Sequence, residues 1–222
     1  MTPIERKEHS IAILKEQKIP YIDWLPVIEE EITIAARSAE EIMKRACCCL
    51  IAIQVACDYN QQADMQESKA FFSGFLLKFD LQEELTPKER VLFEGEPTEQ
   101  EAINLAWKYE AIWPLFWACG FVQQLTYPDT LCDVPLLIDI LKRNNSFDEI
   151  INQVKLRTID ELLNEADLIF RYDWACVDAR LKNQEAPGNL NSGVVYERHC
   201  GLNWLIGKNT SNDDWDTVSA DT

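Results

Sequence analysis

The sequence predicts an all-α protein, because one helix-start signature recurs along the chain and apolar residues follow it at helical spacing. The signature is a serine or threonine three positions before a glutamate, and it begins at Ser38, Thr86, Thr98, Ser146 and Thr158. In such a capping box the hydroxyl accepts a hydrogen bond from a first-turn N–H, and the glutamate accepts one from the cap's own N–H. The recurrence along the chain predicts a mostly helical domain.

The individual elements follow from these starts and from the prolines between them. Residues 4–18 predict a first helix that ends near Pro20. Residues 21–34 contain Pro26 and are ambiguous, so a short strand pair or an irregular turn near the N-terminus is expected there. The other helices are expected at 38–59, 66–79, after Thr86, and at 98–124, 134–143, 147–155, 158–182 and 193–207. We therefore expect about eight to ten helices in a single domain, residues 1–222, with Trp215 docking an otherwise polar tail.

The charge of the chain bears on its partners. The 222 residues carry a formal net charge of -17, and lysines and arginines are scattered singly. A surface of this sign repels phosphate backbones, so we expect no nucleic-acid binding. An acidic surface is compatible with a basic protein partner.

No segment resembles a signal peptide, and the longest apolar run, residues 111–122, is shorter than the ~20 residues that a membrane-spanning helix needs. No membrane association is therefore expected. The eight cysteines include no Cys-x-x-Cys pair. We interpret them as free thiols in a reducing environment, which predicts a cytoplasmic protein.

Motifs for metals and cofactors are missing from the sequence. No Gly-rich phosphate loop and no metalloprotease or hydrolase motif is present. With only His9 and His199 available, a metal site would depend on carboxylates, which suits Mg²⁺ or Mn²⁺ better than Zn²⁺. We expect neither a metal site nor a cofactor.

Glu110 is the first unusual polar residue, because it is the single charge in an aromatic stripe. On a helical wheel it shares one face with Trp107, Pro114, Trp117 and Phe121. Pro114 has no N–H for the carbonyl of residue 110, so both the carboxylate and this carbonyl lack helix partners. Either Glu110 forms a buried salt bridge at a kinked helix, or it is a catalytic carboxylate with a raised pKa.

The helix expected at 158–182 carries a narrow polar stripe that includes Asp167, Arg171 and Asp178, with Trp174 beside it. The stripe is either a solvated face with an Asp167–Arg171 pair or the lining of a polar interior. Arg171, Trp174 and Asp178 are therefore candidate ligand-binding residues.

The last predicted helix contains Glu197, Arg198, His199 and Asn203. His199 lies on an apolar stripe, where it is either a core histidine or a catalytic one, while Glu197 faces the other way, so the two cannot form a dyad. Glu197 and His199 remain catalytic candidates, and Arg198 and Asn203 ligand-binding ones. Arg198 and Arg45 are candidate ion-pair partners for Glu110 or Asp173.

Several segments together resemble a bacterial family catalogued as domain of unknown function 4272, over about residue 37 to the C-terminus. They are Arg37-Ser38-x-Glu40-Glu41-Ile42-x-x-Arg45-Ala46, Trp107-x-Tyr109-Glu110-Ala111, Trp117-Ala118-x-Gly120, Asp167-Leu168-Ile169-x-Arg171-Tyr172-x-Trp174-Ala175, Val195-x-Glu197-Arg198-His199-x-x-Leu202-Asn203-Trp204 and Trp215-Asp216-x-Val218-x-x-Asp221-Thr222. The resemblance implies that Asp167, Arg171, Glu197, Arg198 and His199 matter to the family, for packing or for chemistry. The family carries histidine more often where this chain has Asp173, so no role is transferred to that position.

Two functional hypotheses follow. The first is a cytosolic interaction or accessory protein whose buried ion pairs serve the fold and whose acidic surface meets a basic partner. The second is an enzyme or small-ligand binder in which Glu110, Arg171, Arg198, His199 and Asn203 converge on an internal polar pocket. The sequence favours the first, because no nucleophile, metal cluster or phosphate loop is visible. Neither substrate, partner nor oligomeric state follows from the sequence.

Overall fold

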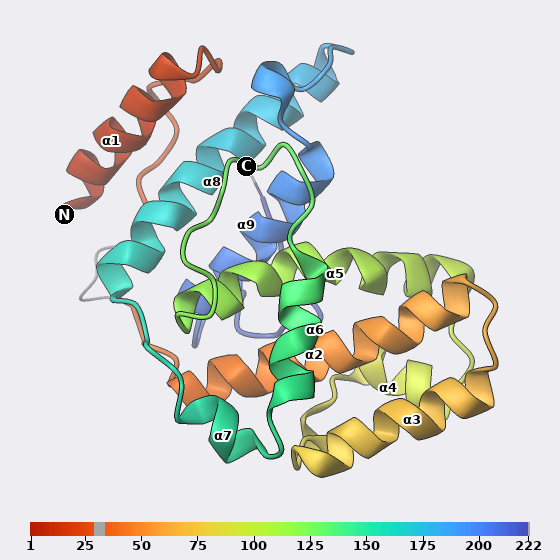
Figure 1. Ribbon diagram of the computed structural model, residues 1–222. Helices are drawn as coiled ribbons and strands as arrows, with labels where there is room; N and C mark the ends of the chain where they lie inside the picture. Colours follow the sequence, from red (N-terminus) through yellow and green to blue (C-terminus); the bar gives the residue numbers. More distant parts are fainter. Residues whose placement is uncertain (29–33, 222) are drawn as a thin grey trace. The chain divides into compact units, whose positions relative to one another are not determined.

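The computed structural model describes residues 1–28 and 34–221, and within them the protein is helical (Figure 1). The predicted all-α class is confirmed: these residues form nine α-helices and two short 3₁₀ helices, and no strand. Part of the segment for which a strand pair was considered, residues 29–33, lies outside the described residues.

The α-helices lie close to their predicted positions. They are α1 (Pro3–Glu16), α2 (Ala39–Asn60), α3 (Met65–Lys78), α4 (Pro87–Glu94), α5 (Glu99–Ala118), α6 (Val134–Arg143), α7 (Phe147–Ile151), α8 (Ile159–Leu181) and α9 (Ser192–Ile206). The 3₁₀ helices are η2 (Gln82–Glu84) and η3 (Pro187–Asn189). None of the helices in the described ranges is long and apolar enough to cross a membrane.

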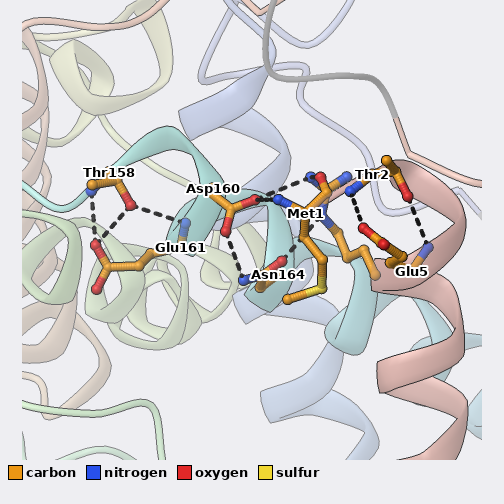
Figure 2. Close-up of polar contacts among 8 residues, drawn as sticks. Met1, Thr2, Glu5, Thr158, Asp160, Glu161 and Asn164 are labelled. Carbon is orange, nitrogen blue, oxygen red and sulfur yellow. Dashed lines mark hydrogen bonds and ion pairs between the residues drawn. The ribbon is translucent and has the colours of Figure 1, made fainter.

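The helix starts follow the capping signature. Ser38, Thr86, Thr98 and Thr158 form complete capping boxes. At Ser146 the hydroxyl accepts from the Glu149 N–H as predicted, but the Glu149 carboxylate accepts from the backbone N–H of Asn145 instead of the cap. Another box, between Thr2 and Glu5, starts α1 and was not predicted (Figure 2).

Two helices end earlier than their sequence predicts. α5 continues through Pro114 but stops at Ala118, because Gly120 adopts a positive φ of 83° and the Lys155 N–H donates to the Cys119 carbonyl at 3.0 Å. A Cβ at Gly120 would lie 2.8 Å from the Lys155 carbonyl oxygen, so a side chain is excluded there. α7 ends at Ile151 rather than near residue 155, because the chain after it leads to Lys155 and its hydrogen bond with the Cys119 carbonyl.

The chain forms two compact units. Unit 1 contains residues 1–37, 123–131 and 157–222, and unit 2 contains residues 38–122 and 132–156. In unit 2, α2 packs against α5, α3 and α4 and is almost wholly buried over its middle. The buried guanidinium of Arg45 on α2 contacts both carboxylate oxygens of Glu89 at 2.5 Å. Glu89 is also the capping-box residue of α4, so one side chain fixes the start of α4 to α2.

In unit 1, α8 packs against both α1 and α9. The starts of α1 and α8 are joined by polar contacts. The α-amino group of Met1 donates to Asp160 at 2.9 Å (Figure 2). The buried Arg6 donates from Nε to Asn164 at 3.1 Å. These contacts hold α1 along α8. The predicted docking of the tail is confirmed, because Trp215 is buried and packs edge-on against the Trp204 ring with 5.4 Å between centroids.

Candidate functional site

A pocket of about 160 Å³ lies within unit 1. Its walls come from α1, the segment 125–128, α8 and α9. Its polar lining residues are Gln17, Thr126, Tyr127, Glu165, Tyr172 and Arg198. Gln17 and Thr126 are solvent-exposed, so the pocket opens to the surface.

One stripe of α8 forms the longest wall of this pocket. Glu165, Leu168, Ile169 and Tyr172 all line it, and their spacing is i, i+3, i+4 and i+7. Residues at this spacing lie on one face of a helix. Because Arg6 and Asp160 hold α1 along α8, Ile13 of α1 and Gln17, the residue that follows α1, line the same pocket.

Glu165 is the unusual member of the stripe. Within the described residues its carboxylate makes neither a hydrogen bond nor an ion pair, although the side chain is half-buried. Burial raises the pKa of Glu165 from 4.5 to about 7, although the positive charges of Arg157 and Arg198 act to lower it. The carboxyl group therefore changes its charge near neutral pH.

Arg198 brings a fixed positive charge to the same pocket. It is buried on α9, and its Nη1 donates to the Thr126 carbonyl oxygen at 2.8 Å. This bond ties the pocket-lining segment 125–128 to α9.

Two tyrosines complete the polar lining. The Tyr172 hydroxyl donates to Gln17 Oε1 at 2.6 Å, and burial raises the pKa of Tyr172 to about 12. The Tyr127 hydroxyl donates to the Gly188 carbonyl oxygen at 2.6 Å, and its ring packs edge-on against Tyr172. Gly188 has a positive φ, and a Cβ there would lie 2.6 Å from the Tyr127 hydroxyl. Glycine at 188 is therefore needed for Tyr127 to hold this position.

Of the residues singled out from the sequence, Arg198 lines this pocket. Arg171, a predicted binding residue, is buried and forms a bidentate pair with Asp167, at 2.7 and 2.8 Å. Its Nη2 also donates to the Pro26 carbonyl oxygen at 3.3 Å. These contacts give Arg171 and Asp167 a packing role that ties the segment before residue 29 to α8.

His199 and Glu197 are both buried on α9 and do not line the pocket. His199 Nδ1 lies 3.0 Å from Asp173 Oδ2, so the partner of Asp173 is His199 rather than an arginine. Asn203 Nδ2 donates to the Ser219 carbonyl oxygen at 2.9 Å, which anchors the C-terminal segment.

The remaining candidates lie elsewhere. Trp174 is partly buried on α8, and Asp178 pairs with Lys182 at 2.7 Å on the surface, so neither lines the pocket. Glu110 belongs to unit 2, where it is buried and its Oε1 accepts from the Cys132 N–H at 2.5 Å.

The ion-pair partner suggested for Arg45 is corrected by the structure. The ion pair that Arg45 forms in the described residues is with Glu89, a residue that was not among the suggested partners. Glu89 is not a charged residue on an otherwise apolar helix face. It is the capping-box residue of the neighbouring helix α4. The pairing therefore depends on how α2 and α4 pack against each other, and the spacing of residues in the sequence does not predict that packing.

Glu165 and Tyr172 were missed from the sequence, although a signal was present. Glu165 is a single carboxylate on a stripe with Leu168, Ile169 and Tyr172, the same pattern that drew attention to Glu110. The polar stripe singled out on this helix was the one that includes Asp167, Arg171 and Asp178.

The arrangement can perform two kinds of chemistry. A carboxyl that titrates near neutral pH can accept or donate a proton, and in its charged form it can bind a cation. Among the described residues, no group of three or more His, Cys, Asp or Glu side chains is placed to hold a metal ion.

The sequence of the chain matches one known protein family. A family model described as "Domain of unknown function (DUF4272)" matches residues 6–218. No curated protein and no solved structure matches the chain.

Proposed function

Because the chain belongs to the DUF4272 family, whose description names no activity, we propose a function from the pocket itself: the protein binds a small polar molecule in unit 1. The observation that carries the proposal is Glu165, an unpaired carboxylate on the wall of a pocket that opens to solvent. Ionising such a group without a partner is unfavourable, and a ligand that pairs with it removes this cost.

Three buried carboxylates with basic partners offer a contrast to Glu165. Glu89, Asp167 and Asp173 are buried, and each has a basic partner within 3.0 Å. Glu165 lines a cavity and lacks such a partner among the described residues. A ligand is the partner that its position allows.

A thermal-shift screen tests the proposal. The purified protein is screened against amino acids, amines, carboxylic acids, sugars, nucleotides and divalent metals, in parallel with Glu165→Gln and with Glu185→Gln as a control at an exposed loop position. A ligand at about 100 times its Kd adds about 2.7 kcal/mol to the folded state. The expected result is a ligand that stabilises the wild type and Glu185→Gln but not Glu165→Gln. A well-folded protein that no compound stabilises would contradict the proposal.

A second candidate function, an interaction or accessory protein, is favoured by the surface of α3. This helix buries Ser68 and Leu76, while Phe71 is 60% exposed and Leu77 is 69% exposed. Exposed large apolar side chains on one helix are typical of protein contacts. The net charge of -17 favours a basic partner. A partner that is captured by the wild type but not by a Phe71→Ser, Leu77→Ser double variant would support this function, and equal capture by both would contradict it.

We further propose that the protein is cytosolic and bacterial, in line with the family that its motifs resemble. All eight cysteines, which lie in the described ranges, are free thiols. Burial raises the pKa of Cys48 to about 12, which suits an inert structural thiol. Free buried thiols support a reducing compartment. Localising a tagged copy in the source cells by fractionation tests this proposal, and recovery in an oxidising compartment would contradict it.

A further inference from the structure

We propose that the pocket of unit 1 binds an amino acid with an aliphatic side chain, its ammonium group on Glu165 and its carboxylate toward Arg198. This inference rests on the proposed function and adds the class of ligand. It is carried by the placement of two opposite charges and by the chemistry of the walls between them.

The two charges share the pocket without neutralising each other by contact. Glu165 and Arg198 are the charged residues among those that line it. The positive charge of Arg198 acts on Glu165, yet no ion pair within 4.0 Å is formed by the Glu165 carboxylate in the described part of the chain. Both groups therefore line one pocket without forming an ion pair with each other. A ligand that carries both charges fits such a pocket with each end on its opposite.

The apolar wall sets the nature of the rest of the ligand. Ile13 of α1, Leu168 of α8 and Leu202 of α9 line the same pocket. These side chains offer no hydrogen bonds and favour an aliphatic group, because apolar surface that leaves water here adds about 25 cal/mol per Å². The volume of about 160 Å³ limits the ligand to a small molecule.

The charge of the whole protein argues against a simple anion. With a formal net charge of -17, the surface repels anions and attracts cations. A zwitterion carries no net charge, so its approach is not opposed. Its ammonium group gains a carboxylate partner, and its carboxylate gains the guanidinium.

The groups that face Glu165 determine how binding depends on pH. The positive charges of Arg157 and Arg198 act on Glu165, and burial raises the pKa of Tyr172 to about 12. The pKa of Tyr127 is also raised by burial, and Ile13 of α1 and Gln17, directly after α1, have no ionisable group. Glu165 is therefore the described lining group that titrates near pH 7.

The titration of Glu165 predicts whether ligand binding releases or takes up a proton. An ammonium group binds the ionised carboxylate, so binding releases a proton from the fraction of Glu165 that is protonated. The affinity for the amino acid should rise about tenfold per pH unit below pH 7 and level off above it. A ligand that used the protonated carboxyl as a hydrogen-bond donor would show the opposite sign.

The experiment is isothermal titration of the full chain with alanine, valine, leucine, isoleucine and methionine, in two buffers with different ionisation enthalpies. Two matched compounds dissect the best ligand: isoamylamine is leucine without its carboxylate, and isocaproate is leucine without its ammonium group. Loss of either charge should weaken binding roughly 10- to 100-fold. Glu165→Gln should weaken amino-acid binding to a similar extent, and Glu185→Gln should leave it unchanged.

The outcomes separate this inference from the proposed function. Binding with proton release that requires both charged ends and Glu165 supports both. If the broad screen finds a Glu165-dependent ligand but isocaproate binds as well as leucine, or a proton is taken up, the amino-acid assignment is wrong and the ligand site stands. If the broad screen is flat for a well-folded protein, both fail.

Discussion

Replacing Glu165 with glutamine should stabilise the protein, and the gain should grow with pH. Glutamine keeps the size and shape of the side chain but removes the charge that burial disfavours. The pKa of Glu165 rises from 4.5 to about 7, and each pKa unit corresponds to about 1.36 kcal/mol. Ionising Glu165 in the folded protein therefore costs roughly 3 kcal/mol.

The direction of the pH dependence follows from the two states. Below about pH 4.5 the carboxyl is protonated in both the folded and the unfolded chain, so it has no effect. Between about pH 4.5 and pH 7 the unfolded chain ionises first and stability is lost; above about pH 7 the loss is complete. The Glu165→Gln variant lacks this loss, so its advantage should be below about 1 kcal/mol at pH 5 and roughly 3 kcal/mol at pH 8.5.

Urea unfolding of the wild type and of Glu165→Gln between pH 5 and pH 8.5 measures this difference directly. Other titrating groups are common to both proteins and cancel in the comparison. Glu185→Gln removes an exposed carboxylate and should show a flat difference. If the Glu165→Gln difference were also flat, or if glutamine destabilised the protein at pH 8.5, Glu165 would have a favourable partner and the reasoning would fail.

Three further changes test other parts of the structure. Glu89→Gln keeps the capping box of α4 but removes the carboxylate charge that pairs with the buried Arg45 guanidinium, and urea unfolding should show a loss of about 3–5 kcal/mol. Gly188→Ala places a Cβ against the Tyr127 hydroxyl, so it should lower the melting temperature and weaken binding at the pocket, whereas an unchanged melting temperature would contradict the positive φ. Trp215→Ala should cost about 3–5 kcal/mol by chemical unfolding, and a negligible change would mean that the tail does not dock.

Helix starts could be predicted from the sequence because their physical cause is local. At Thr98 and Thr158 the hydroxyl and the glutamate three residues later satisfy each other's backbone, and no other part of the chain is needed. Helix ends were less predictable for the opposite reason. α5 stops at Ala118 because the N–H of Lys155, distant in sequence, bonds to the carbonyl of Cys119.

The contacts around the candidate site were likewise predictable where they are local in the sequence and unpredictable where they join different helices. The sequence correctly anticipated the Asp167–Arg171 pair, because residues four apart lie side by side on a helix. The solvated face considered for this pair was wrong, because both side chains are buried. It did not anticipate that Arg45 meets Glu89, or that Asp173 meets His199, because these pairs join different helices. The pocket itself is built by three helices and one loop, so Arg198 was a candidate whereas its opposite charge, Glu165, was not.

The proposed function accounts for an unpaired carboxylate at position 165. Glu165 shares one face of α8 with Leu168 and Tyr172. An apolar or neutral residue at position 165 would avoid the loss of roughly 3 kcal/mol at alkaline pH. Residues that reduce stability without a compensating contact are typical of functional sites, where activity needs a group that the fold does not satisfy. The two measurements on Glu165→Gln must therefore be interpreted together. A more stable protein that no longer binds its ligand identifies a functional carboxylate, whereas a more stable protein with unchanged binding makes Glu165 a tolerated defect in the packing of α8.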